Sequence, residues 1–235
     1  CSQNFEIAAE YGLLKQALTS SNIISMYLII GLGNPGKKYI GTRHNAGFAC
    51  LDFIRNHWEF PSFRENSSFR AECSEGRIAT EKILLARPST FMNRSGDAVR
   101  NISQFYKIGS RHIAVIHDDL DIPLGEVRES FGSRSAGHNG VEDIIGALGT
   151  KDFLRFRIGI KHASEDAEKI PQKDNATFVL EPFSSHERAL VEATFPKIAT
   201  ALYTWFLDKK RFVILAKDAR KLLDTTFLPR THKNS

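Results

Sequence analysis

The chain has 235 residues, of which 42% are hydrophobic and 25% are charged, a composition typical of one globular domain with a full core. No apolar run approaches the roughly 20 residues that span a bilayer, which excludes an integral membrane protein. The three cysteines lie far apart without a C-x-x-C spacing, so they argue against a disulfide framework or a zinc knuckle. This cysteine usage fits a reducing cytosol or an organelle stroma, and we expect a cytoplasmic protein without a membrane partner.

The positive charge is concentrated at one end of the chain. The formal net charge is +5, and residues 205–235 carry eight Lys or Arg against three Asp, which accounts for the whole excess. Two interpretations of this tail stay open. It is either a solvated helix face or a contact with the phosphate backbone of a nucleic acid.

The predicted domain begins at Met26, which immediately precedes the first convincing strand. Residues 1–25 are poor in glycine, mildly acidic and begin without Met, and their single Lys makes them a poor transit peptide. We therefore expect residues 26–235 to form the domain and residues 1–25 to be an extension of uncertain status.

Apolar periodicity predicts an alternation of strands and helices along the rest of the chain. A turn at Glu75 and Gly76 separates two of the strands, Ser95 is the expected cap of the second helix, and Ser184 with Glu187 forms a capping box. The predicted strands are 27–30, 69–74, 82–87, 113–116, 126–131 and 153–160. The predicted helices are 46–57, a segment around 99–106, 141–148 and the end of the chain from 184. Such alternation favours an α/β domain with a largely parallel or mixed sheet.

The stretch "IIGLGNPGKKYIGT" contains two well-known glycine spacings. Gly31, Gly33 and Gly36 fit the dinucleotide pattern G-x-G-x-x-G, but no helical periodicity follows Gly36 and no acidic residue ends a next strand. The triphosphate-loop pattern fails because Lys38 replaces the hydroxyl residue that holds magnesium. Neither nucleotide interpretation is favoured.

Polar residues gather at four predicted strand-to-helix positions, where open α/β sheets bind their ligands. A His beside a carboxylate can act as a general base on water, and carboxamides can orient a carbonyl group and that water. No nucleophile motif stands out, which favours direct attack by water, while the acidic run "HDDLDIP" leaves a magnesium site open as the less favoured alternative. The four clusters are Asn34 with His44 and Asn45, Met92 with Asn93, His117 with Asp118, and His138 with Asn139.

Four segments together are identified with a known family. In their order and spacing, "IIGLGNPGKKYIGTRHNAG", "RPSTFMNRSG", "HDDLDIPLGEVR" and "GHNGVEDIIGALG" followed by "FLRFRIGI" closely resemble bacterial-type peptidyl-tRNA hydrolase. The resemblance covers residues 26–160 strongly and the helical end loosely. It implies a monomer with one three-layer α/β/α domain and a twisted mixed sheet. It also implies a cofactor-free and metal-free esterase that releases tRNA from peptidyl-tRNA.

The resemblance also assigns roles to individual residues. It implies that His44 is the general base and that Asp118 orients it. Asn34, Asn93 and Asn139 would hold substrate and water, and Tyr39, Phe91 and Met92 would line the cleft. Contacts with tRNA phosphates map to Arg128, Arg157 and the helical tail.

The loop before "GHNG" departs from the family pattern, because Ser133, Arg134 and Ala136 replace glycines and Ser130 stands where a Lys is expected. We hypothesise that Arg134 restores the lost positive charge. The alternative to an enzyme is an RNA-binding protein on the same fold, since fold alone does not determine function. The complete set of His44, Asp118 and three asparagines favours the enzyme.

Overall fold

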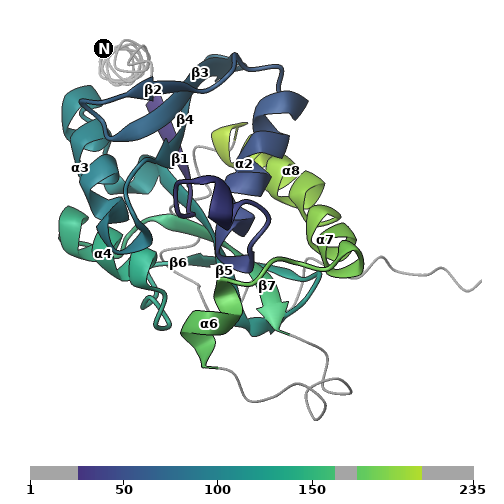
Figure 1. Ribbon diagram of the computed structural model, residues 1–235. Helices are drawn as coiled ribbons and strands as arrows, with labels where there is room; N and C mark the ends of the chain where they lie inside the picture. Colours follow the sequence, from purple (N-terminus) through teal and green to yellow (C-terminus); the bar gives the residue numbers. More distant parts are fainter. Residues whose placement is uncertain (1–25, 162–173, 208–235) are drawn as a thin grey trace, which may run out of the picture.

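A computed structural model describes residues 26–161 and 174–207 of the chain (Figure 1). A sheet of seven strands lies between two helical layers, with α3 and α4 on one face and α2 and α8 on the other. The strands are β1 (Met26–Gly31), β2 (Arg64–Asn66), β3 (Ala71–Ile78), β4 (Glu81–Pro88), β5 (Ile113–Pro123), β6 (Val127–Phe131) and β7 (Leu154–Lys161). The expected three-layer α/β/α domain is confirmed.

Short 3-10 helices precede several of the α-helices and carry residues of the predicted site. The α-helices are α2 (Ala46–His57), α3 (Ser95–Tyr106), α4 (Asn139–Leu148), α6 (Asn175–Val179), α7 (Ser185–Glu192) and α8 (Phe195–Leu207). The 3-10 helices are η2 (Lys37–Tyr39), η3 (Arg43–Asn45), η4 (Met92–Arg94) and η5 (Ser110–His112). Among the described residues, no helix combines the length and apolar character that a membrane crossing requires.

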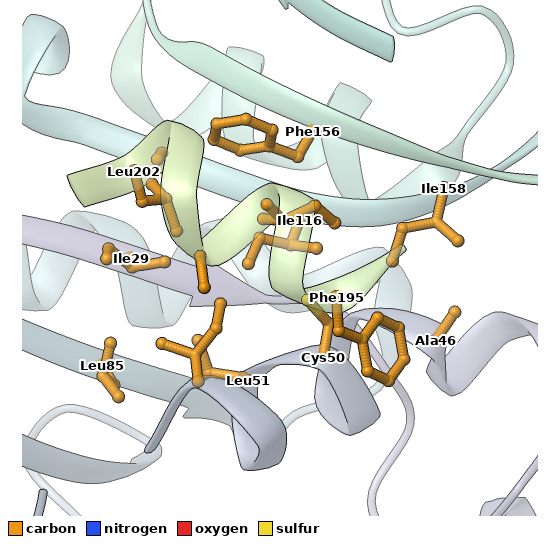
Figure 2. Close-up of a cluster of buried hydrophobic side chains, with 14 of the residues drawn as sticks. Ile29, Ala46, Cys50, Leu51, Leu85, Ile116, Phe156, Ile158, Phe195 and Leu202 are labelled. Atoms are coloured by element: carbon orange, nitrogen blue, oxygen red, sulfur yellow. The ribbon is translucent and has the colours of Figure 1, made fainter. Parts of the chain in front are cut away.

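The sheet is mixed, with strand order β2-β3-β4-β1-β5-β7-β6. The four central strands β4, β1, β5 and β7 run parallel, and β2, β3 and β6 add antiparallel edges. The central strands are buried on both faces, which explains their continuous apolar runs. Figure 2 shows the core on one face, where Ile29, Ile116 and Phe156 of the sheet pack against Leu51 of α2 and Leu202 of α8.

Several predicted elements match the structure closely. The helix predicted over 46–57 has these bounds, and the capping box of Ser184 and Glu187 begins α7. Two predictions on residues 1–25 and on the basic tail lie outside the described residues, apart from the end of α8.

Two local predictions are wrong, and one predicted strand is too short. Ser95 does not cap α3 but is its first residue, and its hydroxyl donates to the Met92 carbonyl oxygen at 2.8 Å. Glu75 and Gly76 lie inside β3, and the turn to β4 comes later, where Ala79 adopts a positive φ of 51°. The strand predicted over 113–116 continues through polar residues to Pro123, because pairing with β7 supports it.

The glycines near β1 allow helix α2 to begin directly against the sheet. A Cβ on Gly47 would overlap the carbonyl oxygens of Ile116 and Leu32, so two strand ends approach the helix backbone there. Gly33 lies under the Phe48 ring, where a Cβ would come within 2.7 Å of a ring carbon. Only the three-residue η2 follows Gly36, so the chain offers no α-helix N-terminus to a phosphate at this point.

We predict that Gly47→Ala destabilises the fold by about 1–3 kcal/mol, because backbone on both sides cannot yield to the methyl group. Gly146→Ala is the control, since Gly146 lies within α4 and a Cβ there meets nothing within 4 Å. The control is expected to be neutral or to stabilise by about 0.5–1 kcal/mol through helix propensity. Urea denaturation measures both, and equal stabilities of the two variants would contradict the close packing.

Candidate active site

The predicted site converges on the carboxylate of Asp118, which is only 3% exposed. Asp118 lies within β5, not after it as the predicted strand end implied. His44 from η3 places its Nδ1 at 3.0 and 3.1 Å from the two carboxylate oxygens of Asp118. His138, the N-cap residue of α4, places its Nε2 at 3.1 Å from one of them. Three separate elements therefore meet at one buried negative charge.

The hydrogen-bond partners define the tautomers of both imidazoles. Nδ1 of His138 accepts a hydrogen bond from the backbone N–H of Val141, so Nε2 carries the proton and donates to Asp118. An ionised carboxylate only accepts, so Nδ1 of His44 also carries a proton. This leaves the Nε2 lone pair of His44 available, and among the described residues no protein group is recorded as bonding to it.

The two histidines also keep the carboxylate charged. Burial alone would raise the pKa of Asp118, but the neighbouring His138 and His44 outweigh this effect and hold the pKa well below its ordinary value. Asp118 is therefore ionised at neutral pH. The site thus contains a permanent negative charge beside two imidazole rings whose centroids are 5.0 Å apart.

His117 belongs to the support of the site, not to its open part. As the neighbour of Asp118 in a strand, it points to the opposite face and is fully buried. Its Nδ1 lies 2.7 Å from the Asp118 carbonyl oxygen, and its ring packs edge-on against His138 with centroids 4.7 Å apart. Burial holds the pKa of His117 well below its ordinary value, so this imidazole is neutral.

A second set of contacts fixes the loop after β1. Asn45 uses both ends of its carboxamide on the backbone of Asn34, accepting from the N–H at 2.9 Å and donating to the carbonyl oxygen at 3.0 Å. The side-chain oxygen of Asn34 in turn accepts from the Met92 N–H at 2.8 Å. The sequence placed Asn45 in a polar cluster but gave it no role, and the structure shows that it links η3 to the β1 loop.

The other two predicted asparagines are exposed and share a cleft. Asn93 and Asn139 line an opening of about 600 Å³ between α3 and α4, which does not include His44, Asp118 or Asn34. Tyr39 and Phe91 meet edge-on at 6.4 Å between ring centroids, and Phe91 is 57% exposed. Met92 is instead buried, with its sulfur against Gly140. A separate cavity of about 380 Å³ at β3 and the end of α3 contains none of the predicted site residues.

The predicted phosphate contacts lie on β6, on β7 and on the loop before α4. Arg128 and Arg157 are direct partners across β6 and β7. Arg128 is exposed and lies 3.4 Å from Glu126, whereas Arg157 donates to Asp119 at 2.8 Å. Arg134 is exposed on residues 132–138, the loop that joins β6 to α4.

Buried Arg155 holds this loop, and the sequence analysis missed it. Its guanidinium donates to the Arg134 carbonyl oxygen at 2.9 Å and to the Ser133 hydroxyl. Burial, with Arg157 nearby, lowers the pKa of Arg155 to about 10, which keeps it charged at neutral pH. The signal in the sequence was the alternation in "FLRFR", which places Arg155 on the same face as Arg157.

The donor set of His44, Asp118 and His138 also resembles a metal site. Their ligand atoms lie within 4.8 Å of one another, and two imidazoles with one carboxylate can bind a transition metal. In the structure these same atoms are joined by two hydrogen bonds, each with its proton accounted for. The carboxylates of Asp118 and Asp119 in the acidic run "HDDLDIP" do not form a shared magnesium site, because Asp118 faces the histidines whereas Asp119 pairs with Arg157.

The amino-acid sequence is similar to one family of known proteins. The family model described as peptidyl-tRNA hydrolase matches residues 28–221. A peptidyl-tRNA hydrolase of Brevibacillus brevis is 42% identical over 180 residues, which are 77% of this chain and 91% of the relative. One from Neisseria meningitidis serogroup C is 47% identical over 145 residues, or 62% of this chain and 74% of the relative.

A solved structure agrees with the sequence relatives. The crystal structure of peptidyl-tRNA hydrolase from Acinetobacter baumannii is 33% identical, has a TM-score of 0.68, and covers 77% of this chain and 88% of that one. The sequence match, the fold and its coverage all agree with the expected family. The chain therefore belongs to the peptidyl-tRNA hydrolase family.

Proposed function

We propose that His44 is the general base in the reaction of this family, the hydrolysis of the ester between a peptide and the terminal ribose of tRNA. One observation carries the proposal: Nδ1 of His44 is held 3.0 Å from the ionised carboxylate of Asp118. This contact orients the ring and leaves Nε2 as the basic atom. His44 is also 12% exposed, whereas Asp118 and His138 are more deeply buried.

The reaction needs a base, a water molecule and positioning. Nε2 of His44 removes a proton from water as the water oxygen attacks the ester carbonyl carbon, and Asp118 stabilises the imidazolium that forms. The tetrahedral intermediate then loses the ribose oxygen, which takes the proton from His44. The second proton of the water leaves the peptide carboxyl group for solvent, so the products are the peptide carboxylate, one proton and the tRNA hydroxyl, and atoms and charges balance.

The asparagines supply the positioning in this proposal. Asn93 and Asn139 both line the opening between α3 and α4, and we assign their exposed carboxamides to binding the ester carbonyl and the water. The oxygen of Asn34 is already used on η4, so its amide nitrogen is the group left to donate to the substrate. Tyr39 and Phe91, which meet edge-on, are the aromatic residues assigned to the wall of the substrate cleft.

We also propose that Arg128, Arg134 and Arg157 contact tRNA phosphates and that the protein acts as a cytoplasmic monomer. The support for the phosphate contacts is the shared edge of β6, β7 and the loop before α4. The support for a monomer is that all the site groups belong to one chain, so a second copy is not needed to complete them.

We predict that His44→Ala lowers kcat by about 10²–10⁴-fold while tRNA binding persists, because the base and the phosphate contacts are separate groups. Release of tRNA from N-acetyl-aminoacyl-tRNA in EDTA measures the effect, with unblocked aminoacyl-tRNA as the control substrate. Near-normal turnover by the variant would show that His44 is not the general base. Loss of wild-type activity in EDTA, with recovery on adding a metal ion, would favour a metal centre at the same three residues.

Asp118→Asn is expected to lower kcat by about 10²–10⁴-fold, because an amide can donate to His44 and so favour the tautomer without a basic Nε2.

A stability measurement tests the negative charge of Asp118 itself. Folding lowers the pKa of this carboxylate, so the carboxylate stabilises the folded protein when the pH is above its pKa in the unfolded chain, near 3.9. This contribution to the free energy of unfolding is lost as the pH falls below that value. The stability difference between wild type and Asp118→Asn should therefore narrow by about 1 kcal/mol between pH 5 and pH 3. A constant difference in urea denaturation would contradict the depressed pKa.

The phosphate contacts predict a change in salt dependence. Arg134→Ala and Arg128→Ala should each reduce the slope of log Kd against log salt concentration by about 1, because each removes one phosphate contact. Lys197→Ala is the matched control, since Lys197 is exposed on α8 in the opposite helical layer. An unchanged slope for Arg134→Ala would mean that Arg134 does not replace the missing lysine.

A further inference from the structure

The short helix η3 connects three distant parts of the chain through three consecutive side chains. His44 reaches Asp118 of β5 at 3.0 Å, and Asn45 binds the backbone of Asn34 after β1. The residue before them, Arg43, extends away from the site into a different set of contacts, and its side chain is only 6% exposed. Its function is not explained by the reaction described above.

Arg43 is bound by residues about 135–144 positions later in the chain. Its guanidinium donates to Glu187 at 2.9 Å, to Glu181 at 3.4 Å and to the Phe178 carbonyl oxygen at 3.3 Å. It also lies over the Phe178 ring, 4.2 Å from the centroid. Burial raises the pKa of Glu187, but hydrogen bonds from the Ser184 N–H and from Arg43 outweigh this, so the pKa is lowered and Glu187 is ionised at neutral pH.

The backbone on both sides of Arg43 is attached to the same segment. The Arg43 N–H donates to the Glu181 carbonyl oxygen at 3.0 Å, and the Phe183 N–H donates to the Gly41 carbonyl oxygen at 3.0 Å. Between them, Thr42 and Pro182 form an isolated β-bridge. The turn that carries His44 is therefore fastened to the chain between α6 and α7.

The contacts of Arg43 are not needed to hold α7 and α8 on the sheet. Val191, Phe195 and Leu202 already bury themselves in the core, and the capping box of Ser184 and Glu187 is complete without a guanidinium. The specific effect of Arg43 therefore falls on η3, which is only three residues long.

We propose that Arg43 is a positioning residue that sets the orientation of His44 by anchoring η3 to α6, to α7 and to the segment between them. This inference rests on the proposed role of His44 as the base. A small displacement of η3 would lengthen the His44–Asp118 hydrogen bond and move Nε2 from its place beside the substrate. Misplacement of a reacting group by about 1 Å can cost about 10²-fold in rate.

Arg43→Met tests the proposal, because methionine keeps much of the length and apolar contact but removes the charge and the donors. We expect kcat to fall by about 10–100-fold with little change in KM, and Arg43→Lys to recover part of the loss. The proton on Nδ1 of His44 provides a structural signal, since its low-field NMR resonance should shift or disappear in Arg43→Met.

Arg87→Met is the matched control for loss of a partly buried guanidinium. Arg87 pairs with Asp52 and Glu72, each at 2.8 Å, and lies 4.1 Å from the Phe63 ring centroid, but it contacts no predicted site residue in these interactions. Its kcat should stay within about 3-fold of wild type. Equal kcat values for Arg43→Met and Arg87→Met, or an unchanged His44 resonance in Arg43→Met, would overturn the proposal.

Glu187→Gln provides a second test of the proposal if Arg43→Met does not fold. Glutamine can still accept from the Ser184 N–H but no longer pairs its charge with Arg43, so we expect kcat to fall by about 3–10-fold. An unchanged kcat would overturn the proposal. His44→Ala in the same assay separates the two proposals. Full turnover by that variant would refute the role of His44 as the base, and the His44 resonance in Arg43→Met would then decide whether Arg43 orients the ring.

Discussion

The buried carboxylate of Asp118 is the constraint on which the arrangement of the site depends. An ionised group that is 3% exposed must be hydrogen-bonded, and Asp118 meets this requirement with imidazoles from two other parts of the chain. His44 and His138 can both reach it only if η3 and the start of α4 approach the same stretch of β5. Satisfying one charge therefore fixes the geometry of the base.

The glycines after β1 make that approach possible. Helix α2 begins two residues after His44, and Gly47 lets its first turn lie against the backbone of Leu32 and Ile116. Any side chain at Gly47 would push α2 away from the sheet and carry η3 with it. In the glycine-rich stretch that resembles a nucleotide-binding loop, a Cβ on Gly31 would meet the Gly47 backbone and a Cβ on Gly33 would meet the Phe48 ring. These glycines therefore let the start of α2, and the histidine before it, lie close to the strand that bears Asp118.

The sequence was sufficient for the fold class and for the residues that gather at the site, because both depend on local patterns. Apolar periodicity located α2, and clusters of polar residues at element ends pointed to His44, Asp118 and His138, whose side chains meet in the structure. The sequence did not predict which side chains contact one another. Arg43 binds residues far along the chain, and Arg155 is buried although it is charged, so neither could be placed without the packed structure. The end of β5 was missed because its last residues are polar and are held by pairing with β7.

The unusual loop before α4 illustrates how a buried charge can organise a binding surface. Arg155 is 1% exposed and donates to the Ser133 hydroxyl and to the Arg134 carbonyl oxygen, so the loop supplies acceptors that the sheet does not. A glycine at position 133 would remove the hydroxyl and leave part of this guanidinium without its partner, which is costly for a buried charge. The hydrogen bond from Arg155 therefore gives the serine a structural role. Because the same guanidinium binds the backbone of Arg134, the loop that presents this exposed positive charge is fixed from within the domain.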